Sequence, residues 1–174
     1  MVSLERVLGR DLETGFMAEK SIAIAADHAG FALKEVLRRE LATLGWRVTD
    51  LGTDGPERVD YPDFGQAMSE EIAAGRAALG VIICGTGIGI AIAANRNPAV
   101  RAAVCHDVST ARLSRQHNDA NVLALGSRVV SEDAAKECLR VFLETAFEGG
   151  RHAVRVAKLG AEGGAARPAL RQVK

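Results

Sequence analysis

A cysteine followed by alternating glycines is the feature of this chain best suited to chemistry. Cys84 ends an apolar run, and Gly85–Gly89 then reads Gly-Thr-Gly-Ile-Gly before another apolar stretch. If the first run is a strand, the thiol lies at its carboxyl end, the edge at which open α/β sheets bind ligands. Backbone N–H groups after that point favour an anion and a thiolate. A base beside such a loop can remove a proton next to a carbonyl group.

Cys84 also has a plainer interpretation, because free cysteine is a small residue that is often buried. Cys105, at the end of a later apolar run, is assigned to that class, and the glycine loop sets Cys84 apart from it. The loop has a rival interpretation as a dinucleotide fingerprint, with Asp107 as the ribose-binding acid. Its spacing is G-x-G-x-G rather than G-x-G-x-x-G, and it follows the third expected strand, so a nicotinamide or flavin cofactor is not the preferred prediction.

Asp27 and His28 follow the first apolar run directly. Asp27 has two interpretations, a helix N-cap or a catalytic acid. Two titratable side chains at one strand end are more than a cap requires, which favours a functional pair.

A second polar cluster, His117, Asn118 and Asp119, ends a helical stretch just before another apolar run. A histidine at a helix C-terminus can simply complement the helix dipole, or it can face a ligand, and the sequence leaves both open. Arg151 and Arg155 share one face if their segment is helical. That face is either only solvated or a clamp for a phosphate group.

The elements that must position these residues alternate along the chain. Apolar runs predict strands over residues 21–26, 46–51, 79–84, 100–105 and 122–125. Helical spacing predicts helices over 31–44, about 64–74, 90–95, 108–116 and from a Ser131 cap to about 147, with 52–63 as a loop. This order predicts an α/β fold, a single doubly wound Rossmann-like domain with a five-stranded parallel sheet. We expect an extension over 1–20, the domain over 21–159 and a mobile tail over 160–174.

Composition narrows the class of protein further. The chain has 174 residues, 48% of them hydrophobic, and a formal net charge of zero, which speaks against a nucleic-acid partner. Its three cysteines lack the spacing of a disulfide framework or a zinc site, so a reducing cytoplasm is expected. No apolar run reaches membrane-spanning length, so no membrane partner is expected.

Several of these motifs occur together in one known family. The chain resembles the B-type ribose-5-phosphate isomerases and their sugar-phosphate isomerase relatives over about residues 22–158. The matching segments run in order and without a large gap, and they are Ala26–Lys34, Asp60–Asp63, Ile83–Asn95, Ser114–Ala124, Gly126–Val130 and Glu148–His152.

The resemblance implies a Rossmann-like domain that needs no nucleotide, metal or other cofactor. It implies a small phosphorylated sugar as substrate and a homodimer, or a dimer of dimers, whose active sites are completed across the interface. Family members use either a cysteine at the strand end or a glutamate in the loop as the base. Cys84, with Ile88 and Ile90 in and after the loop, places this chain with the cysteine type.

The activity that the resemblance implies is the interconversion of ribose 5-phosphate and ribulose 5-phosphate through an enediolate. It assigns ring opening to His117 with help from Asp27, proton transfer to Cys84, and contact with the enediolate to Thr86. Two alternatives stay open: an isomerase of allose 6-phosphate, galactose 6-phosphate or a tetrose phosphate, and a sugar-phosphate-binding protein without catalysis. The residues expected to contact substrate are Asp27, His28, Tyr61, Gly85, Thr86, Gly87, Ile88, Gly89, Asn118, Arg128, Arg151 and Arg155.

Overall fold

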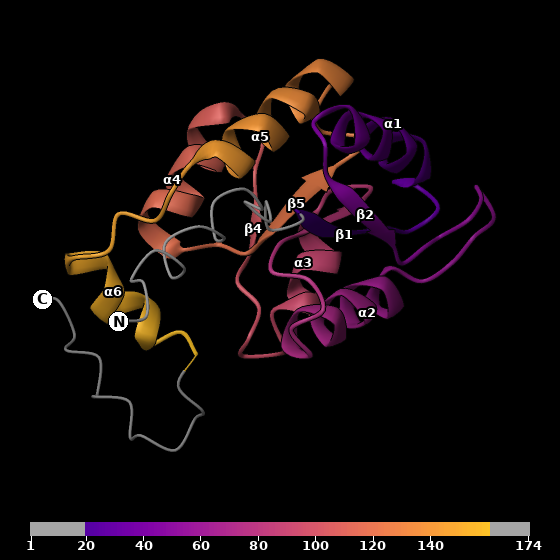
Figure 1. Ribbon diagram of the computed structural model, residues 1–174. Coiled ribbons are helices and arrows are strands. Elements are labelled where there is room, and N and C mark those ends of the chain that lie inside the picture. The colour runs from indigo at the N-terminus through magenta and orange to yellow at the C-terminus, as the bar shows by residue number, and fades with distance from the viewer. Residues whose placement is uncertain (1–19, 161–174) are drawn as a thin grey trace, which may run out of the picture.

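A parallel sheet forms the centre of the protein (Figure 1). The computed structural model describes residues 20–160, and within that range five strands pair in the order β2-β1-β3-β5-β4. Every pairing is parallel, so the predicted α/β class with a five-stranded parallel sheet is confirmed. The strands are β1 (Ser21–Ala26), β2 (Arg47–Asp50), β3 (Gly80–Cys84), β4 (Ala102–Val104) and β5 (Val122–Gly126).

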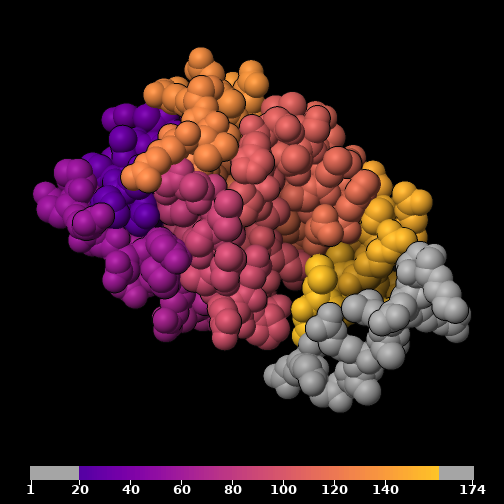
Figure 2. Space-filling view, turned by 180° about the vertical axis from the view of Figure 1, so that it is seen from behind, coloured from indigo at the N-terminus to yellow at the C-terminus, as the bar shows by residue number. Residues whose placement is uncertain are grey.

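Helices cover both faces of this sheet. Side chains of α1, α4 and α5 pack against one face, and those of α2 and α3 pack against the other. The last helix, α6, lies beyond these layers, at the end of the molecule away from α1 and α2 (Figures 1 and 2). The helices are α1 (Phe31–Thr43), α2 (Tyr61–Ala73), α3 (Ile88–Ala94), α4 (Val108–Asn118), α5 (Glu132–Glu144) and α6 (Arg151–Ala157).

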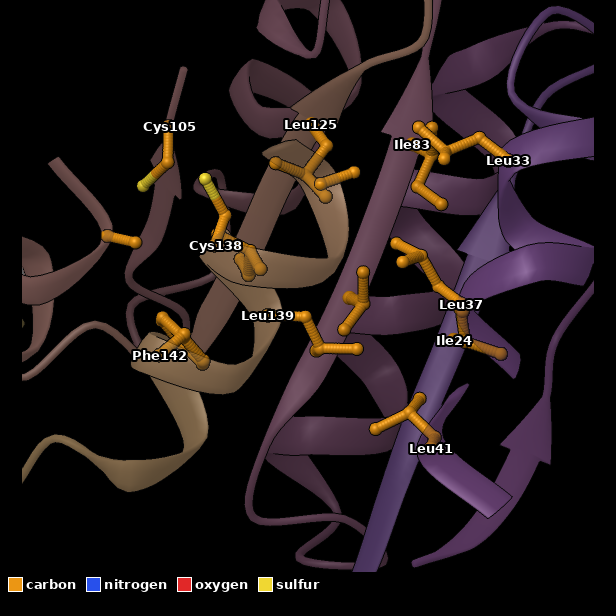
Figure 3. Close-up of a cluster of buried hydrophobic side chains, with 14 of the residues drawn as sticks. Ile24, Leu33, Leu37, Leu41, Ile83, Cys105, Leu125, Cys138, Leu139 and Phe142 are labelled. Atoms are coloured by element: carbon orange, nitrogen blue, oxygen red, sulfur yellow. The ribbon is translucent and has the colours of Figure 1, made fainter. Parts of the chain in front are cut away.

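Strand periodicity decides which way the cysteine points. Successive side chains of a strand face opposite sides of the sheet. Ile83 therefore joins the core under α1 and α5, whereas Cys84 joins the core under α2 and α3. Figure 3 shows the first of these cores, where leucines of α1 and side chains of α5 close over the sheet; its labelled residues include Ile24, Leu33, Leu37, Ile83, Leu125, Leu139 and Phe142.

The second helix begins earlier than the sequence pattern predicts. The expected loop over 52–63 ends at Asp60, and α2 starts at Tyr61 rather than near residue 64. Asp60 has the extended backbone of an N-cap, and Pro62 lies in the first turn, where its missing N–H costs nothing. Tyr61 is consequently held by a helix end instead of a flexible loop.

Other boundaries shift by a few residues. The predicted Ser131 cap is confirmed, since its hydroxyl accepts a hydrogen bond from the Ala134 N–H at 3.2 Å. The helix that it starts ends at Glu144 and not near residue 147. The preceding helix, α4, continues past residue 116 to Asn118, which puts His117 in a regular last turn.

Parts of the expected domain plan lie outside the described range. The extension expected over 1–20 is described only at Lys20, and the tail expected over 160–174 only at Gly160. Among helices within 20–160, none has the length and apolar character needed to cross a membrane.

Candidate active site

Three strand ends are tied together at the carboxyl edge of the sheet. The Asp27 N–H donates to the Ile83 carbonyl at 3.1 Å, and the Ser127 N–H donates to the Cys84 carbonyl at 2.9 Å. The Ser127 hydroxyl also donates to the Ala29 carbonyl at 2.7 Å, across 98 positions of the sequence. These bonds fix the ends of β1, β3 and β5 relative to one another, so groups carried on them form one rigid site.

Cys84 is the centre of this edge. Its side chain is buried on the α2–α3 side, and its Sγ accepts a hydrogen bond from the Gly87 N–H at 3.1 Å. The Thr86 hydroxyl oxygen accepts from the Ile88 N–H at 3.3 Å. Two backbone N–H groups of the loop therefore donate to the Cys84 thiol and the Thr86 hydroxyl, which orients both side chains.

Glycine is required in the loop for two physical reasons. Gly87 has a φ of +78°, a conformation that side chains disfavour. A Cβ at Gly87 would also lie 2.9 Å from the carbonyl carbon of Leu125. A Cβ at Gly126 would likewise lie 2.6 Å from the carbonyl carbon of Thr86, so the loop after β3 packs closely against the end of β5 and neither glycine has room for a side chain.

Tyr61 and Arg128 flank the loop on its outer side. A Cβ at Gly89 would lie 2.6 Å from Cε2 of Tyr61, so the tyrosine ring rests directly on that glycine. A Cβ at Gly85 would lie 3.1 Å from Nη1 of Arg128, so the guanidinium group lies beside the first residue of the loop. Both expected substrate contacts accordingly share one edge with Cys84.

Asp27 and His28 lie in the turn after β1. Asp27 is buried, and its Oδ1 accepts from the Gly30 N–H at 3.0 Å, so it shapes the turn at this edge of the sheet. Nδ1 of His28 lies 3.1 Å from the Val59 carbonyl oxygen and 3.3 Å from the Val59 N–H nitrogen. The imidazole is thereby held against the loop that leads to α2, whichever ring nitrogen carries the proton.

The remaining expected site residues lie at the opposite edge. Cys84 pairs with Gly126, the last residue of β5, whereas α4 ends at Asn118, shortly before Val122 begins β5. A strand rises about 3.3 Å per residue, so the two ends of β5 are about 13 Å apart. Four of the expected residues share this second edge, at the end of α4 and on α6: His117, Asn118, Arg151 and Arg155.

This second group includes two residues to which the sequence analysis assigns no role. The rings of His117 and His152 stack with centroids 4.3 Å apart, and Oε2 of Glu148 approaches both Nε2 atoms, at 4.0 and 3.7 Å. Burial lowers the pKa of His152, and the adjacent His117 ring lowers it further, so the buried imidazole favours its neutral form. Nε of Arg151 donates to Nε2 of His152 at 3.3 Å, which fits that form.

Sequence reasoning could have suggested part of this cluster. Glu148 and His152 stand four residues apart, a spacing that would bring the two side chains together on a helix, although Glu148 in fact precedes α6. Their contact with His117, however, spans more than thirty positions, and no periodicity reports it.

Asp107, the acid in the dinucleotide interpretation, has a structural task. Its Oδ1 accepts from the Thr110 N–H at 2.8 Å, and the two residues form a capping box at the start of α4. The hydrogen bond from the Thr110 backbone is also the main reason that the pKa of Asp107 is lowered. Asp107 therefore acts as a helix cap, and this role accounts for the acid that the dinucleotide interpretation assigns to the ribose.

Comparison with known proteins agrees with the geometry. The family model described as Ribose/Galactose Isomerase matches residues 22–159. Ribose-5-phosphate isomerase B of Escherichia coli (strain K12) is 47% identical over 137 residues, covering 79% of this chain and 92% of that protein. D-erythrulose-4-phosphate isomerase of Pectobacterium atrosepticum is 42% identical over 141 residues, covering 80% and 93%. The solved structure of Clostridium thermocellum ribose-5-phosphate isomerase B is 51% identical with a TM-score of 0.80, covering 80% of this chain and 95% of that one.

Proposed function

The chain belongs to the ribose/galactose isomerase family, and from that premise we propose that it is an enzyme that interconverts ribose 5-phosphate and ribulose 5-phosphate. One observation carries the proposal: the Cys84 thiol lies at the carboxyl end of β3 and accepts a hydrogen bond from Gly87, in a loop where Gly87 and Gly89 have no room for a side chain. We also propose a cytoplasmic location, which the three free thiols favour.

The proposed reaction uses His117 for ring opening and Cys84 for proton transfer. His117, with Asp27, moves the proton that opens the sugar ring. The Cys84 thiolate then removes the proton from C2, next to the aldehyde, and the electrons of that bond form an enediolate. The Thr86 hydroxyl and loop N–H groups stabilise its negative oxygen. Transfer of the hydroxyl proton from O2 to O1 and return of the carbon-bound proton to C1 then give the ketose. The substrate loses no electrons, so no redox cofactor enters the balance.

We propose that a second copy of the chain completes each site. His117 and Cys84 lie at opposite edges of one sheet, too far apart to act on one small sugar. Both edges also expose apolar side chains, which a second copy would cover. Ile88 and Ile92 on α3 are 54% and 62% exposed, and Val154 on α6 is 64% exposed. A two-fold arrangement of two chains would bring the α6 end of one against the α3 loop of the other, giving a homodimer or a dimer of dimers.

The identity of the sugar needs a direct comparison. One relative is named for erythrulose 4-phosphate, and the same proton transfer serves aldose phosphates with four to six carbons. Measuring kcat/KM on ribose 5-phosphate, allose 6-phosphate, galactose 6-phosphate and a tetrose phosphate would decide. We expect ribose 5-phosphate to have the highest value, and a higher value for another sugar would transfer the proposal to it. Absence of turnover with all of them would favour a binding protein.

Replacing Arg151 or Arg155 with alanine should mainly raise KM for the phosphorylated sugar. The two side chains lie one turn apart on α6 and are exposed, as a clamp that meets a second copy requires. Each alanine variant would lose a charge-assisted hydrogen bond to the phosphate group, worth about 1.5–3 kcal/mol. Lys158→Ala, a neutralised cation at the end of the same helix, is the matched control. Competitive inhibition by inorganic phosphate should weaken in parallel, and unchanged phosphate inhibition would remove that arginine from the clamp.

Replacing His117 with alanine should damage ring-closed substrate more than substrate that enters open. The phosphorylated C5 oxygen of ribulose 5-phosphate cannot close a five-membered ring. Exchange of its C1 proton with solvent deuterium needs the base but no ring chemistry. We expect this exchange, followed by NMR, to survive in His117→Ala far better than turnover of ribose 5-phosphate does.

His106→Ala, in an exposed loop, is the control for that measurement. Loss of exchange and turnover to the same extent would mean that His117 acts in the proton transfer itself or only holds the site together, and it would overturn the ring-opening role.

A further inference from the structure

The stacked His117 and His152 form a cluster with Glu148, and the proposed isomerase reaction gives no role to Glu148 or His152. The three side chains come from the end of α4, the start of α6 and the segment between α5 and α6. His152 is buried, His117 is half-buried and Glu148 is exposed. All three donor atoms lie within 4.8 Å of one another, so the side chains are close enough to turn toward one ion.

The spacing of the donors is close to that of a metal site. Metal–ligand bonds of about 2.0–2.1 Å at tetrahedral angles hold neighbouring donor atoms about 3.4 Å apart. Oε2 of Glu148 lies 3.7 Å from Nε2 of His152 and 4.0 Å from Nε2 of His117. The two imidazole rings are stacked with their planes 6° apart, so their Nε2 lone pairs lie in nearly parallel planes. Binding one ion through all three atoms therefore requires the half-buried His117 ring to leave its stack on His152 and the exposed Glu148 to turn toward it. A coordination position would then be left for water.

The donor set selects the class of ion. Two imidazoles and one carboxylate are ligands typical of zinc and its neighbours, whereas magnesium and calcium prefer oxygen alone. We propose that His117, Glu148 and His152 bind a divalent transition-metal ion such as Zn²⁺, and that the bound ion inhibits the enzyme by occupying His117. The inhibitory part rests on the proposed function, while binding of the ion does not.

The surrounding charges set an upper limit on the affinity. The Arg151 guanidinium group now donates to Nε2 of His152 at 3.3 Å and must turn away before an ion can bind there. Arg151 is exposed, so it has room to turn, but it and Arg155 still repel a cation. We therefore expect binding in the micromolar range, weaker than a structural zinc site. Such an ion would regulate or poison the enzyme and would not be needed for activity.

Cobalt binding tests the site without any assay of activity. The full chain, treated with chelator, is titrated with Co²⁺ and followed by visible absorption. We expect one ion per chain with the d–d bands of nitrogen and oxygen ligands and without a thiolate charge-transfer band. Zn²⁺ should displace it and Mg²⁺ should not. A thiolate band would move the ion to a cysteine and overturn the proposal, as would absence of binding at micromolar Co²⁺.

Variants then identify the ligands. His152→Asn and Glu148→Gln should each weaken Co²⁺ binding about tenfold or more, because each removes one of three donors. Glu148 is exposed, so its variant keeps the test valid if the buried His152 change disturbs folding. The matched control is Glu144→Gln, because Glu144 is also an exposed carboxylate that precedes α6. This variant should bind Co²⁺ as the wild type does. Unchanged binding by Glu148→Gln and His152→Asn would overturn the assignment.

Inhibition is measured separately, against the metal-free activity of each variant. Micromolar Zn²⁺ should inhibit turnover of ribose 5-phosphate, and excess chelator should restore it. The C1 exchange of ribulose 5-phosphate should be less affected, because it needs Cys84 but not His117. If Zn²⁺ suppresses exchange and turnover equally, the inhibiting ion binds at Cys84 rather than at His117. An enzyme that turns over substrate but never binds Co²⁺ overturns this proposal alone, and one that binds Co²⁺ without isomerase activity overturns only the inhibition and the proposed function.

Discussion

Cys84→Ser should lower kcat for ribose 5-phosphate by about a thousandfold, within the range expected for loss of a general base. A serine hydroxyl is far too weakly ionised near neutral pH to take a proton from carbon, whereas a thiol can supply its thiolate. The substitution changes one atom in a buried position, and the Gly87 N–H that now donates to Sγ can donate to the new oxygen. The protein should therefore stay folded and should still bind inorganic phosphate.

The control for this variant is Cys105→Ser, the same exchange just beyond the end of β4. Cys105 lies in the core under α1 and α5, and burial raises its pKa, so it has the properties of a structural thiol. Its replacement should leave most of the turnover intact, although a buried hydroxyl can lower stability. Near-normal kcat in Cys84→Ser, measured beside it by a coupled or direct ketose assay, would remove Cys84 as the base.

The carboxyl-edge part of the site is predictable because of how parallel sheets are built. The ends of β1, β3 and β5 meet at one edge, so Asp27 and Cys84 follow from strand assignments alone. The place of Arg128 follows in the same way, since it comes just after β5. These inferences needed only the order of elements and did not depend on their exact ends.

The second edge is harder to predict because long-range contacts define it. The position of α6 depends on the irregular segment after α5, where Gly149 and Gly150 have positive φ and the Glu148 N–H donates to the Gln116 carbonyl. Sequence spacing gives the common face of Arg151 and Arg155 but not what that face meets. The early start of α2 is hard to predict for a local reason, since a Tyr-Pro pair after several loop residues has no apolar periodicity.

Mixing two inactive variants should restore activity, if each site takes Cys84 from one chain and His117 from another. Cys84→Ala lacks the base at every site, and His117→Ala lacks the ring-opening group at every site. In a mixed dimer, one site combines both defects and the other has neither. Random exchange of equal amounts makes half of the dimers mixed, so about a quarter of the wild-type activity on ribose 5-phosphate should return.

A control mixture of two variants from the same edge shows whether recovered activity comes from sites shared between two chains. Asp27 and Cys84 lie at the same edge of one chain, on strand ends joined by the hydrogen bond from Asp27 N–H to Ile83. A mixture of Asp27→Ala with Cys84→Ala therefore gives two damaged sites in every dimer and should recover nothing.

The measurement is initial-rate turnover after the two chains are unfolded and refolded together, or after co-expression with different tags. Mixed dimers isolated through both tags should show about half of the wild-type activity, because one of their two sites is intact. The separation of His117 and Cys84 by the length of β5 is what makes recovery possible, since a site within one chain could not be repaired by a neighbour. If the Cys84→Ala and His117→Ala mixture stays as inactive as its components while forming mixed dimers, the proposal that His117 of one chain acts with Cys84 of another is wrong.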